Sequence, residues 1–204
     1  MKVEELVLIL HGLLSEDEQY KRNAVEERAK VLYELARALE SGHIVELGTE
    51  KGYGAIALAV GAMDGAGGVV YTVDNYKPNP GWAGEVYPAE NRKIFFDNLA
   101  FMDELGYPVS RHVVQIEADV MEAANRFMDD SVSLLYIDTG LPDITLLTAQ
   151  AWDRCVKVGG IIAMRDTLTR SMKTDQASDY FTATGRYEAT ESPSRYFVMI
   201  KKVR

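Results

Sequence analysis

The chain has 204 residues, of which 47% are apolar and 26% are charged, and its formal net charge is −9. This composition is ordinary for a globular domain with a core of its own, and the acidic balance leaves no overall basic footprint of the kind that nucleic-acid or phospholipid binding usually requires. The single cysteine, Cys155, cannot form an internal disulfide, and the chain has no metal-type spacing of cysteine and histidine.

The N-terminal segment predicts two helices. Residues 3–14 have the pattern of a short amphipathic helix. Ser15 and Glu18 then form a capping-box pair, and apolar residues at helical spacing predict a second helix that reaches Glu40 and stops at Gly42. These helices would cap the remainder of the chain, and pairing through them would give a homodimer.

Strands and helices alternate through the rest of the chain. The expected strands are 43–47, 68–74, 111–117, 132–138 and 160–164, and the expected helices between and after them are 53–63, 91–105, 121–128, 142–156 and 172–184. Two final strands, 186–191 and 196–201, are joined by a Ser-Pro-Ser turn. The alternation predicts right-handed crossovers and a mostly parallel sheet, whereas the short closing turn makes the last strand antiparallel.

This order of elements predicts a single α/β domain over residues 1–204. Its core, residues 43–204, would be a Rossmann-like, doubly wound, mostly parallel sheet with an antiparallel C-terminal strand, and residues 1–42 would form an N-terminal helical cap. In such sheets ligands bind outside the carboxyl ends of the strands, where the strand order reverses.

Acidic side chains lie at or just after the carboxyl ends of the expected strands. They are Glu46, Asp74, Glu117, Asp119, Asp138 and Asp166. Polar residues also begin ordinary loops, and this alternative stays open for each acid taken singly. Their common place on the ligand-binding edge nevertheless indicates a functional site.

The first strand is followed by a glycine loop. Gly48 and Gly52 lie between the strand and a helix, where glycine permits a positive φ and the helix N-terminus attracts negative charge. A dinucleotide fingerprint, G-x-G-x-x-G, would require glycine at positions that hold Glu50 and Tyr53. The spacing therefore disfavours NAD or FAD.

The segment Glu46-x-Gly48-x-x-x-Gly52 resembles motif I of the class I S-adenosylmethionine-dependent methyltransferases. Residues 159–167, G-G-I-I-A-M-R-D-T, are similar to a stretch in the small-molecule O-methyltransferase group, of the methyltransferase domain 24 type. The resemblance covers residues 43–202 and also includes the Ile137-Asp138 step, the helix at 91–99 and the loop around Trp82.

The resemblance implies S-adenosylmethionine as the cofactor and assigns residues to its parts. Gly48 and Gly52 would line the methionine part. Glu46 would lie beneath the loop and orient it, although capping of local amides is an equally good explanation. Asp74 would accept hydrogen bonds from the ribose hydroxyls, because charge-assisted bonds are strong.

Further residues complete the implied cofactor site. Asp119 and Val120 would lie beside the adenine, and Asp138 would lie near the methionine group or the reacting centre. The full predicted set of cofactor-binding residues is Glu46, Gly48, Thr49, Gly52, Asp74, Asn75, Asp119, Val120 and Asp138.

The same resemblance places Asp138, Asp166 and Arg165 at the catalytic centre. Related enzymes that act on hydroxyls often hold a divalent metal there, and Asp138 and Asp166 match two such positions; oxygen ligands suit Mg²⁺. Arg165 departs from the pattern because a guanidinium cannot ligate a cation and would repel it, and Thr139-Gly140-Leu141 replaces a stretch that is often rich in acids and histidine. We therefore favour a metal-free site, with Asp166 as base or orienting group. Arg165 would pair with Asp138 or Asp166, bind an anionic substrate group, or simply point away from the site as an exposed arginine.

Other polar residues offer fewer roles. His43 and His112 begin strands, at the end of the sheet away from the ligand, and are expected to be structural, whereas the place of His11 stays open. The segment from Tyr76 to Pro88, with Trp82, predicts either a substrate lid or an ordered loop that simply packs down.

These observations predict an S-adenosylmethionine-dependent methyltransferase that acts on a small molecule, at a hydroxyl oxygen. The alternatives are a protein that binds the cofactor without catalysis and a nicotinamide oxidoreductase. The N-terminus lacks the layout of a signal peptide, and no apolar run approaches the ~20 residues that span a bilayer. We expect a cytoplasmic protein without a membrane or nucleic-acid partner.

Overall fold

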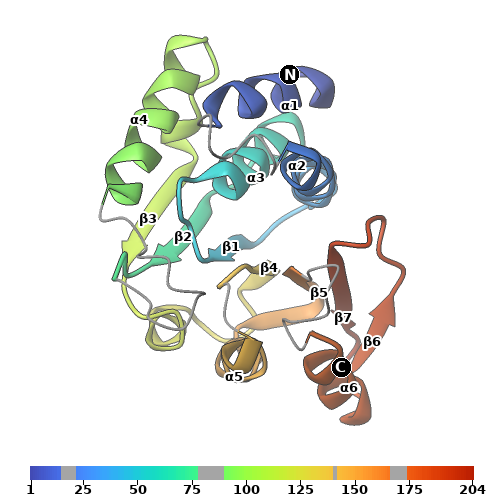
Figure 1. Ribbon diagram of the computed structural model, residues 1–204. Coiled ribbons are helices and arrows are strands. Elements are labelled where there is room, and N and C mark those ends of the chain that lie inside the picture. Colours follow the sequence, from blue (N-terminus) through green and yellow to red (C-terminus); the bar gives the residue numbers. More distant parts are fainter. Residues whose placement is uncertain (15–21, 78–89, 140–141, 166–173) are drawn as a thin grey trace.

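The computed structural model describes residues 1–14, 22–77, 90–139, 142–165 and 174–204, which Figure 1 draws in colour. The helices are α1 (Val3–Leu13), α2 (Arg22–Arg37), α3 (Tyr53–Asp64), α4 (Asn91–Glu104), α5 (Pro142–Trp152) and α6 (Thr174–Ala183), with 3-10 turns η2 (Val109–Arg111) and η3 (Glu122–Arg126). The strands are β1 (His43–Leu47), β2 (Val70–Asp74), β3 (Val113–Glu117), β4 (Val132–Ile137), β5 (Val156–Arg165), β6 (Tyr187–Thr190) and β7 (Phe197–Lys202). The predicted capping box at Ser15 and Glu18 lies outside the described residues.

One seven-stranded sheet runs through the molecule in the order β3-β2-β1-β4-β5-β7-β6. The pairs among β1 to β5 are all parallel, and β7 is antiparallel to both β5 and β6. This confirms the doubly wound, mostly parallel sheet and its antiparallel C-terminal strand. The strand order reverses at β1, so β1 and its neighbour β4 border the switch point at which ligands bind in such sheets.

The helix predicted over 142–156 is too long at its end, and the strand predicted over 160–164 begins too late. In the structure α5 stops at Trp152, and β5 already begins at Val156. The pairing with β4 shifts register within β5, and Gly159 there has a φ of +84°. The two glycines of this segment therefore form an irregularity inside a longer strand, where sequence alone indicates a strand boundary.

Helices cover both faces of the sheet (Figure 1). The face that carries Ile44 and Leu134 packs against α1, α2, α3 and α4. The opposite face carries Val45 and Leu135 and packs against η3, α5 and α6. Alternate residues of each strand thus enter two separate cores, as strand geometry requires. Within the described ranges, no helix combines the length and the apolar character that a membrane span needs.

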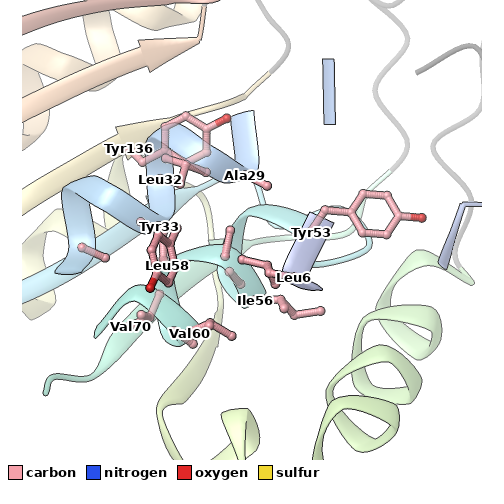
Figure 2. Packing of buried hydrophobic residues seen from close by; sticks show 14 of the residues in the cluster. Leu6, Ala29, Leu32, Tyr33, Tyr53, Ile56, Leu58, Val60, Val70 and Tyr136 are labelled. Carbon is pink, nitrogen blue, oxygen red and sulfur yellow. The ribbon is translucent and has the colours of Figure 1, made fainter. Parts of the chain in front are cut away.

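Close packing of α2 on α3 fixes the position of α2 over the sheet. A Cβ at Gly61 of α3 would lie 2.3 Å from the carbonyl oxygen of Tyr33 of α2, so that only glycine permits this approach. Figure 2 shows Ala29 and Leu32 of α2 near Tyr136 of β4. The helix therefore carries its polar residues close to the carboxyl edge of β4.

Candidate functional site

The carboxyl ends of β1 to β5 share one edge of the sheet, because these strands are parallel. The structure brings the described residues of the predicted site to this edge or to the loops that follow it: Glu46, Gly48, Thr49, Gly52, Asp74, Asn75, Asp119, Val120, Asp138 and Arg165. The predicted catalytic Asp166, the residue Trp82 and the Gly140-Leu141 pair lie outside the described residues.

The loop between β1 and α3 has an unusual backbone. Gly48, Glu50 and Gly52 have φ angles of +96°, +49° and +86°. Gly52 is the N-cap of α3 and, as a glycine, has no side chain with which to cap that end of the helix. The first turn of α3 therefore presents backbone N–H groups and the positive end of the helix dipole toward the loop, which suits the carboxylate or another anionic part of a ligand.

The chain itself requires both loop glycines. A Cβ at Gly48 would lie 2.3 Å from the carbonyl oxygen of Asp138, and one at Gly52 would lie 2.4 Å from Cδ2 of Phe95. Each glycine thus allows the loop to pack on a neighbouring element, β4 in one case and α4 in the other. Their contact with a cofactor stays a prediction that the geometry accommodates.

Asp74, at the end of β2, holds the glycine loop. Its Oδ2 accepts hydrogen bonds from the backbone N–H groups of Thr49 at 3.0 Å and Glu50 at 3.1 Å. Its Oδ1 accepts the backbone N–H of Tyr76 at 2.8 Å. The side chain therefore fixes the shape of the loop, which is a role that sequence reasoning did not assign to it.

Glu46 lies beneath the same loop and is 1% exposed. Its Oε2 accepts a hydrogen bond from the Thr72 hydroxyl at 2.5 Å, and that hydroxyl lies 2.5 Å from the hydroxyl of Thr49. Burial, opposed by the Thr72 hydrogen bond, raises the pKa of Glu46 to about 8. We call Glu46, Thr49, Thr72 and Asp74 the loop cluster.

The predicted adenine-side residues also make contacts within the chain. Asn75 Oδ1 accepts the backbone N–H of Lys77 at 3.0 Å. Asp119 Oδ1 accepts the backbone N–H of Met121 at 2.9 Å, and the carbonyl of Val120 accepts the indole N–H of Trp152 at 2.7 Å. These bonds order the two loops beside β2 and β3, and the contact of these loops with adenine stays a prediction.

Tyr76 follows the loop cluster in a left-handed conformation, with a φ of +49°. Its side chain is only 8% exposed, and among the described residues its hydroxyl has no hydrogen-bond partner. Tyr76 therefore packs into the body of the protein. The rest of the proposed lid, residues 78–88, lies outside the described ranges.

A second cluster surrounds Asp138, just after β4. Arg28 Nη1 of α2 donates to its Oδ2 at 2.7 Å, and Arg165 Nη1, at the end of β5, donates to its Oδ1 at 2.7 Å. The hydroxyl of Tyr136 donates to Oδ2 at 2.8 Å. We call Arg28, Tyr136, Asp138 and Arg165 the arginine cluster. Of the alternatives left open for Arg165, the structure thus shows the pair with Asp138.

The arginine cluster does not suit a divalent cation. Burial alone would raise the pKa of Asp138, but the charges of Arg165 and Arg28 and the bonds from Arg165 and Tyr136 lower it overall. The carboxylate is thus ionised and both of its oxygens are occupied by cationic donors, which would repel a metal ion. The described residues also contain no group of three or more acid, histidine or cysteine side chains that could hold a metal.

Sequence reasoning missed Arg28, Tyr136 and Thr72. A signal for Arg28 exists, because it lies three residues after the buried Val25, within the apolar stripe of α2. An arginine in such a stripe requires a buried partner. Tyr136 and Thr72 lie inside strands, and only the structure shows that each places its hydroxyl beside an acid.

His43, the first residue of β1, and His112, which directly precedes β3, lie at the opposite end of the sheet. The His43 ring packs edge-on against Tyr71, with ring centroids 5.1 Å apart, and His112 Nδ1 lies 3.2 Å from the carbonyl of Gly68. His11 Nε2 lies 3.1 Å from the carbonyl of Arg22. These contacts agree with structural roles for His43 and His112.

The chain matches one protein family and is similar to several solved structures. The family model described as a methyltransferase domain matches residues 45–167. The structure is similar to that of the O-methyltransferase NovP, at 16% identity and a TM-score of 0.67, with 99% of this chain and 98% of that chain covered. No curated protein sequence matches the chain significantly.

Two further solved structures show the breadth of the likeness. An O-methyltransferase from Bacillus cereus in complex with S-adenosylhomocysteine has 15% identity and a TM-score of 0.64, with 99% of this chain and 90% of that chain covered. An rRNA methylase from Streptococcus thermophilus has 15% identity and a TM-score of 0.59, with 88% and 96% covered. At such identities the likeness shows the fold alone.

Proposed function

The chain belongs to this family of methyltransferase domains and has the class I methyltransferase fold, and from that premise we propose that it transfers a methyl group from S-adenosylmethionine to a hydroxyl oxygen of a small molecule. The observation that carries the proposal is the loop between β1 and α3. It combines a helix N-terminus that begins at a glycine N-cap with a backbone that Asp74 holds in one shape.

The residues present fit the cofactor. The loop Gly48–Gly52 and the first turn of α3 would hold its methionine part, Asp74 its ribose, and Asp119 with Val120 its adenine. S-adenosylmethionine supplies an electrophilic methyl group on a sulfonium. The chain's own task is to align the acceptor with that group and to exclude water, because positioning provides much of the rate enhancement in such displacements.

A hydroxyl acceptor must also lose its proton. Asp138 is a poor base, because three donors occupy its two oxygens and its pKa is lowered. We propose a metal-free centre in which Asp166 serves as base or orienting group, and in which Arg165 and Asp138 position the acceptor.

The acceptor class is inferred from the charge of the chain. One structural neighbour is an rRNA methylase, but this chain has a net charge of −9, whereas a nucleic-acid substrate favours a basic footprint. We therefore propose a small-molecule acceptor. The retained alternative is a protein that binds the cofactor without catalysis, because the locked Asp138 provides no base.

Calorimetry and turnover separate these functions. Titration with S-adenosylmethionine should show binding, and a methyl-release assay over a panel of hydroxyl compounds should show turnover on at least one. Binding without turnover on any compound would favour the non-catalytic alternative, and binding of NAD(P) in place of S-adenosylmethionine would contradict both.

Replacement of the ribose-side acid tests the cofactor site directly. Asp74→Ala should weaken the binding of S-adenosylhomocysteine by at least about 1.5 kcal/mol, which is the lower range for a hydrogen bond to a charged group. Asp97→Ala, in an exposed pair with Lys93 on α4, is the control and should leave that affinity unchanged. If the wild type and Asp74→Ala bind S-adenosylhomocysteine equally well, Asp74 does not contribute to the cofactor site.

A further inference from the structure

Arg165, at the carboxyl end of β5, has N–H donors that its hydrogen bond to Asp138 does not use. Its side chain is 31% exposed. Within the described residues it donates one hydrogen bond, from Nη1 to Asp138 Oδ1, whereas a guanidinium carries five N–H donors in a planar fork. Arg28, by contrast, is 13% exposed and donates to Oδ2 of Asp138 at 2.7 Å. Arg165 is thus the member of the arginine cluster that is able to contact a ligand.

The rest of the cluster fixes the direction of that guanidinium. Asp138 cannot turn away from Arg165, because its other oxygen is held by Arg28 at 2.7 Å and by the Tyr136 hydroxyl at 2.8 Å. Arg28 comes from α2, and the neighbouring Glu27 accepts a hydrogen bond from the Ser194 hydroxyl at 2.9 Å. Asp138 and the turn between β6 and β7 thus both hold α2 in place. The guanidinium of Arg165 is therefore ordered before a ligand binds, and a donor that is ordered before binding loses less entropy when it binds.

We propose that Arg165 is a specificity-determining residue that binds a carboxylate, with Arg28, Tyr136 and Asp138 as positioning residues. A planar carboxylate matches the remaining edge of the guanidinium fork in a bidentate manner. Two guanidiniums share the single carboxylate of Asp138 and leave the cluster with one net positive charge, so a monoanion suits the site better than a dianionic phosphate.

The proposal rests on the proposed function, which gives the carboxylate two sources. It belongs either to the methyl acceptor or to the methionine end of the cofactor, and both would lie at the carboxyl edge. The acceptor source requires that the substrate be a carboxylic acid that also carries a hydroxyl. The experiment therefore has one arm for each source and uses defined probes.

The first arm measures binding of a simple carboxylate. Benzoate, acetate and their neutral amides, benzamide and acetamide, are each titrated into the protein, and the affinity of each carboxylate is compared with that of its amide. The titrations are made with the protein alone and with the protein saturated with S-adenosylhomocysteine. We expect at least one carboxylate to bind tenfold more tightly than its amide. Arg165→Met should abolish this preference, and Arg165→Lys should retain part of it because it keeps the charge without the fork.

The second arm compares two adenosine thioethers with the protein alone. S-adenosylhomocysteine carries the amino-acid end, and 5′-methylthioadenosine lacks it. If Arg165→Met weakens only the former by about tenfold or more, the carboxylate is that of the cofactor. If it changes neither while the preference for benzoate or acetate is lost, the carboxylate is that of the acceptor.

Arg186→Met is the matched control, because Arg186 Nη1 lies 2.7 Å from an oxygen of Asp153 and its side chain is 41% exposed. It should leave the results of both arms unchanged, and thermal unfolding should show that each variant is folded.

The proposal is overturned if Arg165→Met and Arg165→Lys bind every probe as the wild type does. It is also overturned if the wild type prefers no carboxylate and Arg165→Met does not affect the binding of S-adenosylhomocysteine. A wild type that binds neither adenosine compound overturns the proposed function instead, and the benzoate titration still decides the site at Arg165.

Discussion

The loop cluster and the arginine cluster share one edge of the sheet but are built in different ways. In the loop cluster, carboxylates accept hydrogen bonds from hydroxyls and backbone amides, and its partners are at most 26 residues apart in the chain. In the arginine cluster, one carboxylate is held by two guanidiniums, and Arg28 and Asp138 are 110 residues apart. The first arrangement shapes a loop, whereas the second fastens the N-terminal helix α2 to β4 and β5.

The difference predicts unequal sensitivity to the loss of a carboxylate charge, and the largest effect is expected at Asp138. Asp138→Asn would leave the buried Arg28 without the carboxylate that it is bonded to and close to Arg165. Removing one partner of a buried pair usually costs more than the pair itself contributes. We expect the free energy of unfolding to fall by about 3 kcal/mol, measured by urea denaturation.

An exposed pair provides the comparison. Lys93 and Asp97 on α4 form an i,i+4 pair with side chains 77% and 57% exposed. Asp97→Asn should cost no more than about 0.5 kcal/mol, as is usual for such pairs. Similar losses for Asp97→Asn and Asp138→Asn would show that the arginine cluster is not a buried anchor.

At the loop cluster, by contrast, the contribution to the free energy of unfolding should depend on pH. The pKa of Glu46 is about 8 in the folded chain, against an ordinary value near 4.5. Below both values the folded and unfolded chains hold the proton equally. Between them the unfolded chain releases the proton and the folded chain keeps it, so raising the pH through this window favours unfolding.

Glu46→Gln removes that proton equilibrium and keeps an oxygen for Thr72. The stability of the wild type relative to Glu46→Gln should therefore fall from pH 5 to pH 8, by at least about 1.4 kcal/mol if one pKa unit is realised. Urea denaturation across this pH range measures it. A constant difference between the two proteins would mean that Glu46 is ionised throughout.

A further comparison concerns packing beneath the loop. A Cβ at Gly54 of α3 would lie 2.1 Å from Oε1 of Glu46, and this carboxyl is buried and bonded to Thr72. Gly54→Ala should therefore cost about 1–3 kcal/mol, as overpacking usually does, and should weaken the binding of S-adenosylhomocysteine through the loop.

Gly12 in α1 is the matched position, because a Cβ there meets nothing within 4 Å. Gly12→Ala should stabilise the fold by about 0.5 kcal/mol, since alanine favours a helix over glycine. Thermal unfolding compares the two variants. A neutral Gly54→Ala would show that the Glu46 side chain moves aside at little cost.

These two clusters also explain how far the sequence could predict the site. The loop cluster follows from a local motif, since strand β1, the two glycines and Asp74 each have a clear signal within a few residues. The bonds within it were not predicted, because the hydroxyl of Thr72 looks like any other strand residue. The arginine cluster depends on how α2 lies over the sheet, and only Arg165 and Asp138 were recognised.

The fold itself was predicted more completely than its boundaries. Alternating strands and helices and a short final turn were sufficient for the parallel sheet and its antiparallel strand. The end of α5 and the start of β5 were misplaced, because the irregularity at Gly159 separates two parts of one strand that sequence patterns treat as different elements.

The place of β7 has a consequence for synthesis on the ribosome. β7 (Phe197–Lys202) lies between β5 and β6 in the sheet, although both precede it in the chain. During translation, β5 keeps an unpaired edge until β7 has emerged, which is a delay of roughly 2–7 s at ~5–20 residues per second. Such an edge is able to pair with other chains, so the nascent protein exposes an aggregation-prone strand edge until β7 is inserted.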